Sequence, residues 1–137
     1  MLGHGDIQVA TYEDLEPAIK DVPLTKRWWQ SPCCGSGPGV VVSDPFSHIV
    51  YFVCGDCGKM QLNIGATRDS QLPPRELMHP LGNDIFAVEL DGQLPSVRFA
   101  DNREVQVIFG NTIRWTFRVS TEKEVADWKE ELGKGEL

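Results

Sequence analysis

The sequence predicts an α+β fold, built mainly from antiparallel strands, with a cysteine-bearing hairpin unit and a C-terminal α-helix packed on the sheet. Three observations predict it: short runs rich in Val, Ile and Phe separated by turn dipeptides, a final run that alternates apolar and polar residues, and a capped helical pattern after that run. The length of 137 residues suits one ordinary domain. We therefore expect residues 1–137 to form a single compact domain.

The first half of the chain predicts one short helix and several strands. Residues 7–10 form a candidate strand, and Thr11 is placed to cap a helix that continues to Ile19. Pro17 is tolerable only in the first turn of that helix. Strands follow at 39–43, 48–53 and 59–64, the first two separated by a turn at 43–45.

Two aromatic neighbours precede these strands. Trp28 and Trp29 cannot point the same way in an extended segment, so one is expected in the core. The other is a candidate exposed contact, since tryptophan is enriched in binding hot spots.

Residues 65–83 show no period. Prolines and a glycine interrupt the segment at Pro73, Pro74, Pro80 and Gly82. We expect a long ordered loop or a linker here.

The last third, residues 84–137, predicts β-hairpins followed by a helix. Strands are expected at 85–90, 97–100 and 104–109, and Gly110-Asn111 fits a two-residue hairpin turn. In the next strand one face is expected to be buried, and its residues are Ile113, Trp115, Phe117 and Val119.

The helix after this strand has a capping signal at its start. Thr121 and Glu124 form a capping box, and Gly133 is expected to end the helix. Its apolar face consists of Val125, Trp128 and Leu132. We expect Trp115 and Trp128 to lie in the core.

Four cysteines form the strongest motif. Cys33 and Cys34 precede Gly35, and Cys54 and Cys57 precede Gly58. Two pairs separated by about 20 residues are the usual pattern of a four-ligand structural zinc site. The sequence therefore predicts one zinc ion held by these four thiolates, with no catalytic residues and no other cofactor.

This segment resembles the zinc-ribbon family, in which Cys-Pro-x-Cys-Gly, two strands, Cys-x-x-Cys-Gly and a third strand follow one another. Residues 31–64 follow that plan, except that Ser31 stands where the first cysteine belongs and Cys33 stands at the variable position. The resemblance implies a structural zinc site. Its fourth ligand is Cys33 or a histidine, His48 or His79, unless the site is degenerate.

Other readings of the cysteines remain open. Free cysteines are often small core residues, and Cys-x-x-Cys is also a redox dithiol motif. Redox motifs of this kind usually open a helix, whereas a strand is expected after Cys57. Structural disulfides would require an oxidising compartment.

The hairpins and helix of residues 84–133 also resemble the C-terminal part of a pleckstrin-homology-like domain, in which a last strand precedes a helix with a buried tryptophan. The basic lipid-binding loop of that family has no clear counterpart here, so phosphoinositide binding is not implied.

Charge and missing motifs limit the possible functions. The net charge of −7, from 13 basic and 20 acidic residues, opposes tight binding to free nucleic acid. A local cluster of basic residues is expected near the C-terminal hairpins, formed by Arg98, Arg103, Arg114, Arg118 and Lys123. Nucleophile-elbow, metalloprotease, phosphate-loop and dinucleotide motifs are missing, so no enzyme and no small-molecule substrate are expected.

The start of the chain lacks the pattern of a secretory signal, and no apolar run is long enough to span a membrane. We therefore expect a cytoplasmic protein without membrane contact. Its expected function is that of a metal-stapled acidic module that binds a protein partner with a basic surface, in a regulatory or inhibitory role. The alternatives are a nucleic-acid-associated zinc ribbon in transcription or processing, and a thiol redox protein.

Overall fold

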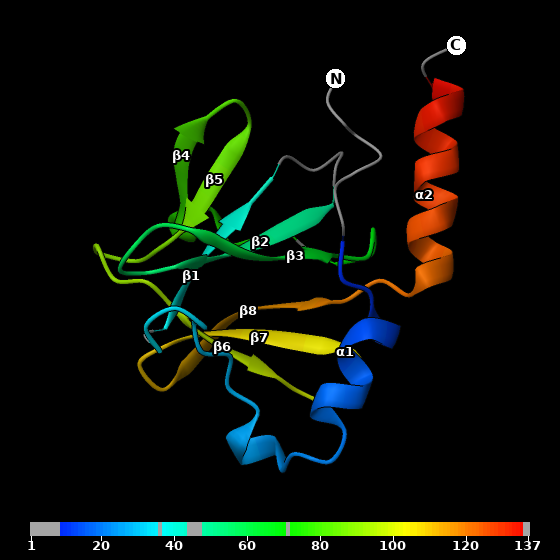
Figure 1. Ribbon diagram of the computed structural model, residues 1–137. Coiled ribbons are helices and arrows are strands. Elements are labelled where there is room, and N and C mark those ends of the chain that lie inside the picture. The colour runs from blue at the N-terminus through cyan, green and yellow to red at the C-terminus, as the bar shows by residue number, and fades with distance from the viewer. Residues whose placement is uncertain (1–8, 36, 44–47, 71, 136–137) are drawn as a thin grey trace.

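The computed structural model describes residues 9–35, 37–43, 48–70 and 72–135, and its strands form two antiparallel sheets that face each other (Figure 1). The five-stranded sheet contains β1 (Pro38–Val42), β2 (Ile49–Cys54), β3 (Met60–Gly65), β4 (Met78–Gly82) and β5 (Ile85–Val88). The three-stranded sheet contains β6 (Ser96–Phe99), β7 (Glu104–Phe109) and β8 (Thr112–Arg118). The helical elements are α1 (Tyr12–Ile19), α2 (Glu122–Gly135) and the 3₁₀ turns η2 (Leu24–Lys26) and η3 (Arg75–Leu77). The predicted α+β class, mainly antiparallel with a C-terminal helix, is confirmed.

The five-stranded sheet has the order β3-β2-β1-β5-β4. One side of the sheet is formed by β3, β2 and β1, which pair as consecutive antiparallel neighbours. The register places Pro38, the first residue of β1, opposite Cys54, the last residue of β2. Because of this register, the loop before β1 and the loop after β2 meet at the same end of the sheet.

Strand β4 corrects the prediction that residues 65–83 are a loop or linker. The strand lies at the sheet edge and pairs only with β5, and a register shift follows Pro80. Proline cannot donate a ladder hydrogen bond, so it is tolerated at an edge. The interrupting residues that hid the strand in the sequence are therefore compatible with its position.

The three-stranded sheet contains the predicted hairpin between β7 and β8. Gly110 alone in the two-residue turn has a positive φ, +63°. In the pairing of β7 with β8, Val107 lies opposite Trp115, and the next residue, Ile108, lies opposite Ile113. Arg114 is therefore an extra residue in β8 and forms a bulge. The alternation therefore stops at the bulge. Ile113 is 46% exposed, whereas Trp115 is buried, which corrects the prediction that both are buried.

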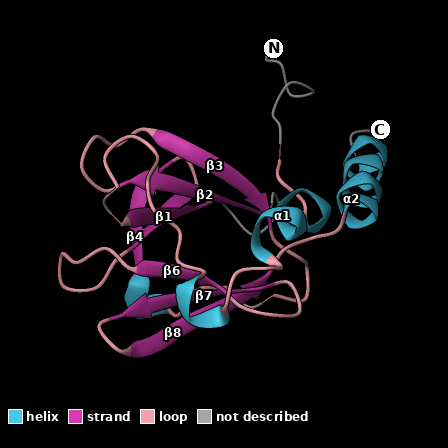
Figure 2. Ribbon diagram, turned by 60° about the horizontal axis from the view of Figure 1, so that its bottom comes forward, coloured by secondary structure: helices cyan, strands magenta, loops and turns pink. Residues whose placement is uncertain are grey.

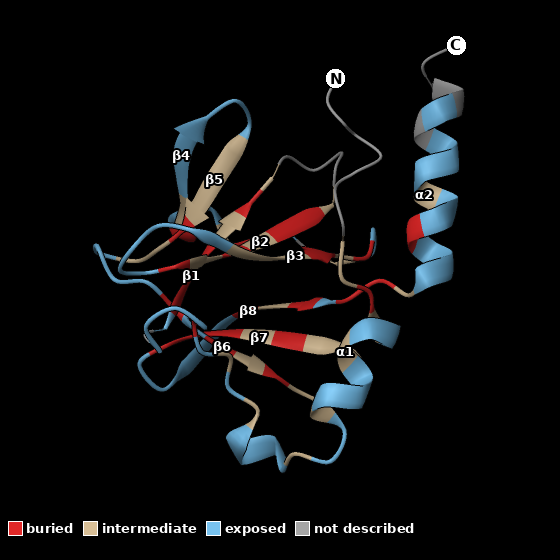
Figure 3. Cartoon of the chain, in the orientation of Figure 1, coloured by how far each residue is buried: buried red, intermediate tan, exposed pale blue. Residues whose placement is uncertain are grey.

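Buried residues of both sheets form one core, and Figure 3 shows buried stretches in strands of both sheets. The ring of Phe52 in β2 lies 6.1 Å from that of Phe99 in β6 and 5.3 Å from that of Trp29. Aromatic pairs at these distances stabilise a core beyond the area that they bury. Trp29 is therefore the core member of the tryptophan pair, and Trp28 is the exposed one.

Both helices lie at one end of the sheets (Figure 1 and Figure 2). Thr11 is the N-cap of α1, as expected, and its backbone N–H donates to the Asp14 carboxylate at 2.9 Å as part of a capping box. Pro17 lies beyond the first turn of this exposed eight-residue helix, which corrects its predicted position. Of the predicted strand at 7–10, residues 7 and 8 lie outside the described part, and Ala10 forms a parallel bridge with Ile64.

The capping box of α2 is confirmed. The Glu124 N–H donates to Thr121 Oγ1 at 3.2 Å, and the Thr121 N–H donates to Glu124 Oε1 at 3.0 Å. Val125 is buried against the end of β3, whereas Trp128 is only half-buried, contrary to the prediction. Helix α2 extends past the sheets (Figure 1), and the ring of Trp128 lies beside that of His48, which precedes β2. The side chain of Leu132 lies outside the described part.

The helix α2 also continues to Gly135, past the expected end at Gly133. Within the described ranges, no helix has both the length and the apolar character needed to cross a membrane.

Candidate metal centre

The four cysteines lie in two loops that the β1–β2 register brings together. One loop spans residues 31–35, and the other spans residues 54–58 and joins β2 to β3. In each loop a backbone N–H donates to the carbonyl oxygen four residues earlier: Gly35 to Ser31 at 2.8 Å, and Gly58 to Cys54 at 3.0 Å. Both glycines have φ of +71°, a conformation that a side chain disfavours.

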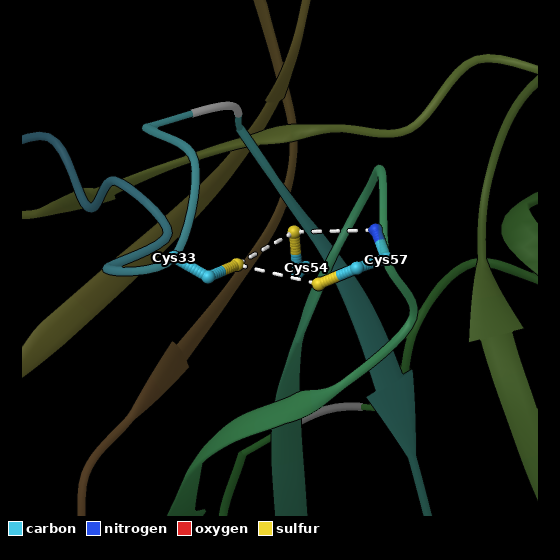
Figure 4. Close-up of side chains that lie close together, drawn as sticks. All are labelled: Cys33, Cys54 and Cys57. Carbon is cyan, nitrogen blue, oxygen red and sulfur yellow. Dashed lines mark hydrogen bonds between the residues drawn. The ribbon is translucent and has the colours of Figure 1, made fainter.

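The sulfurs come close to one another (Figure 4). Cys33 Sγ lies 3.3 Å from both Cys54 Sγ and Cys57 Sγ. Cys34 Sγ lies 3.2 Å from Cys54 Sγ and 3.7 Å from Cys33 Sγ. Sulfurs around a tetrahedral zinc ion are about 3.8 Å apart, because each Zn–S bond is about 2.3 Å long. The four observed separations are close to this, and the ligand atoms of Cys33, Cys54 and Cys57 all lie within 4.8 Å of one another, so these residues could hold such an ion.

The chemical surroundings favour a thiolate at the buried position. The Cys57 backbone N–H points at Cys54 Sγ across 3.5 Å, and Cys54 is 2% exposed. This N–H, followed by the Ser31 hydroxyl, lowers the pKa of Cys54 to about 5. Thiolates are the metal-binding form of cysteine.

Cys33 behaves differently. The Ser31 hydroxyl favours its thiolate, but the neighbouring sulfurs of Cys54 and Cys57, together with burial, outweigh it and raise the pKa of Cys33. Several thiols so close together repel one another once ionised, and a bound cation would remove that repulsion.

The two candidate histidines lie elsewhere. His48 precedes β2 at the end opposite Cys54, about 20 Å away along the strand. The centroid of its ring lies 6.5 Å from the centroid of the Trp128 ring. His79 in β4 is three strands from β2 and lies 3.5 Å from Glu89. Among the described residues, the group able to hold a metal contains only Cys33, Cys54 and Cys57 within 4.8 Å of one another, with Cys34 beside them.

Sequence reasoning missed two residues at this centre. In the sequence Ser31 is only the residue that stands where the family has its first cysteine, but in the structure it is 2% exposed and its Oγ lies 2.9 Å from Cys33 Sγ. Leu94, in the segment between β5 and β6, covers the second loop: a Cβ on Gly55 would lie 3.2 Å from its Cδ1. The small residue at position 55 was the only local signal of this close approach.

The predicted basic cluster is largely neutralised. Arg103 contacts Glu124 at 2.6 Å, Lys123 contacts Asp127 at 2.8 Å, and Arg118 lies 3.8 Å from Asp69. Arg98 lies over the ring of the exposed Trp28, 5.5 Å from its centroid. Arg114 is exposed in β8.

Comparison with protein-family models, with curated proteins and with solved structures finds no match for this chain. Functional inference therefore depends on the chemistry of the described residues. In that part of the chain, the cysteines form a cluster that could hold a metal ion such as zinc.

Proposed function

We propose that this protein is a non-enzymatic, zinc-stapled module that binds a protein partner with a basic surface. The observation that carries the proposal is the four-cysteine cluster, in which four of the sulfur pairs lie 3.2–3.7 Å apart. Four thiolates close the coordination shell of zinc and leave no position for water or substrate. A site of this kind is structural.

The proposed zinc ion would link two loops that are distant in the sequence. It joins the loop at 31–35, which follows the core residue Trp29, to the β2–β3 hairpin. Three of the four cysteines are exposed, so the loops have little apolar burial of their own. A bound ion would supply the stabilisation that a core supplies elsewhere.

Charge supports the partner class. The net charge is −7, and several basic side chains already pair with carboxylates of the same chain. The exposed acidic residues of the two helices include Glu13 and Glu16 in α1 and Glu122 and Glu130 in α2. A partner with a basic face would be attracted to these helices, and the attraction would weaken with salt.

Metal content tests the first half of the proposal. Protein purified without chelator should contain about one equivalent of zinc by elemental analysis. Cys54→Ser and Cys57→Ser should lower this content and the melting temperature together. Less than a tenth of an equivalent, with all thiols freely reactive in the folded protein, would remove the zinc staple from the proposal.

Charge reversal on α2 tests the second half. Glu130→Lys lies late in the helix, where a positive charge suits the helix dipole, so folding should persist. The immobilised variant should retain fewer basic proteins from a lysate of the source cell than the unmodified protein. Glu76→Lys, in η3, is the matched control and should retain them. Equal retention by both variants would contradict a helical binding face.

A further inference from the structure

The two cysteine loops share one backbone conformation. Each closes with a hydrogen bond from its glycine N–H to the residue four positions earlier, at 2.8 Å in one and 3.0 Å in the other. Each glycine has φ of +71°. Superposing these features places Ser31 on Cys54, Cys34 on Cys57 and Gly35 on Gly58.

This correspondence puts a hydroxyl where the second loop has its buried thiolate. Ser31 and Cys54 are both 2% exposed. The Ser31 hydroxyl lies 2.9 Å from Cys33 Sγ, and that sulfur lies 3.3 Å from Cys54 Sγ. The exposed Cys33, two positions later in the same loop, therefore fills the space beside Ser31 that a thiol at position 31 would reach.

We infer that Cys33 is a substitute ligand in a tetrahedral zinc site whose first-loop ligand position is occupied by Ser31, and that positions 31 and 33 are interchangeable sources of the fourth thiolate. In the native site Ser31 is a positioning residue, because its hydroxyl donates to the Cys33 thiolate and holds it towards the ion. Groups that orient metal ligands in this way typically change metal affinity by about 10–100-fold when removed. The inference rests on the zinc centre of the proposed function.

An exchange of the two side chains tests this directly. The proteins are the native chain, Cys33→Ser, the double variant Ser31→Cys/Cys33→Ser, and Ser31→Ala, with Ser96→Ala in β6 as a control serine. Zinc affinity is measured by competition with a chromophoric chelator. Replacement of zinc by Co²⁺ reports the site independently, because thiolate-to-cobalt charge-transfer absorption grows with each bound thiolate.

Cys33→Ser should lose one thiolate from the cobalt spectrum and bind zinc at least about tenfold more weakly. The double variant has the same number of cysteines as the native chain, with one of them moved from position 33 to position 31. It should regain four-thiolate absorption and native affinity to within about tenfold. Ser31→Ala should keep four thiolates but shift the charge-transfer band and weaken zinc binding about tenfold. Ser96→Ala should change neither measurement.

Two results would overturn the inference while leaving the zinc centre intact. The first is a Cys33→Ser variant whose zinc affinity and number of bound thiolates equal those of the native chain. The second is a double variant that binds zinc no better than Cys33→Ser does. If Cys33→Ser does not fold, recovery of circular dichroism and metal binding by the double variant supports the exchange, and no recovery refutes it. Absence of metal from the native chain itself would overturn both this inference and the zinc staple.

Discussion

At the scale of single residues, Ser31 and Glu124 show how one polar side chain acts through its neighbours. Ser31 is buried next to Cys33, and its hydroxyl favours the thiolate forms of Cys33 and Cys54. Glu124 accepts a hydrogen bond from the Thr121 N–H and contacts the Arg103 guanidinium. It therefore links the start of α2 to the β6–β7 turn.

A pH-dependent contribution follows for Glu124. Partial burial by itself would raise the pKa of this carboxyl, but the Thr121 N–H and Arg103 outweigh it and hold the pKa below its usual value. A depressed carboxyl pKa means that the folded protein gains stability above the unfolded pKa and loses it as pH falls through the folded pKa.

Glu124→Gln keeps an oxygen that can cap the helix but removes the charge. Because the Glu124 side chain is 43% exposed, the expected loss near neutral pH is only about 0.5 kcal/mol. Urea unfolding at a series of pH values measures it, and the difference from the native chain should vanish in acid, below the folded pKa. Glu76→Gln is the control, and a difference that persists unchanged in acid would contradict the electrostatic explanation.

At the scale of elements, the decisive contacts join loops that are distant in sequence. The loop at 54–58 lies beneath Leu94 from the β5–β6 connection and against the backbone of Gly37. The second cysteine loop is therefore supported by a segment without cysteines. If the cysteines hold a metal, contacts of this kind would help to orient them.

Gly55→Ala tests this contact. An added Cβ would lie 2.9 Å from the Gly37 carbonyl oxygen and 3.2 Å from Leu94 Cδ1, so the backbone must shift. We expect a loss of about 1–3 kcal/mol in the free energy of unfolding, the usual cost of overpacking. Gly133→Ala in α2 meets no atom within 4 Å and should raise stability by up to about 1 kcal/mol. Equal melting temperatures for Gly55→Ala and the native chain would show that the loop is not confined.

Helix α2 offers a second test at this scale. Trp128 is half-buried against the ring of His48, so Trp128→Ala should cost about 2 kcal/mol, less than the roughly 3–5 kcal/mol of a fully buried ring. Thermal unfolding measures this loss of stability. Val125→Ala is the comparison, because Val125 in the same helix is buried, with 7% of its surface exposed. An unchanged melting temperature for Trp128→Ala would mean that the ring does not help to hold the helix.

At the scale of the whole molecule, two sheets enclose one aromatic core while the charges remain outside. The net charge of −7 repels an approaching phosphate backbone. Many of the basic side chains near the C-terminal hairpins are already engaged by carboxylates, as in the Arg103–Glu124 pair. A basic protein surface meets no such repulsion.

We therefore predict no binding of free nucleic acid at physiological salt. Contacts through a few arginines would release few counterions, so they would add little affinity. Fluorescence anisotropy with labelled single- and double-stranded DNA and RNA at about 150 mM salt measures this affinity. Repeating the titration at low salt separates weak electrostatic attraction from specific binding. Sub-micromolar affinity for any of these ligands would favour the nucleic-acid-associated alternative.

Local patterns in the sequence were sufficient for much of the fold. Strand β7 and the turn at Gly110-Asn111 follow from alternation and turn chemistry, and the start of α2 follows from its capping box. The cysteine pairs likewise predicted a cluster of sulfurs that could hold a metal, because pair spacing and the following glycines are local features. These signals involve residues within a few positions of one another, so no tertiary information was needed.

Tertiary structure alone decided the rest. Residues 78–82 form strand β4 because they can pair with β5 at the edge of the sheet. Ile113 is exposed because a bulge interrupts the alternation of β8. The thiol at Cys33, rather than His48 or His79, lies beside Cys54 because the β1–β2 register sets which loop ends meet. Pairing, register and close packing depend on segments far apart in the chain, and the free energy of those contacts is not encoded in any one of the segments.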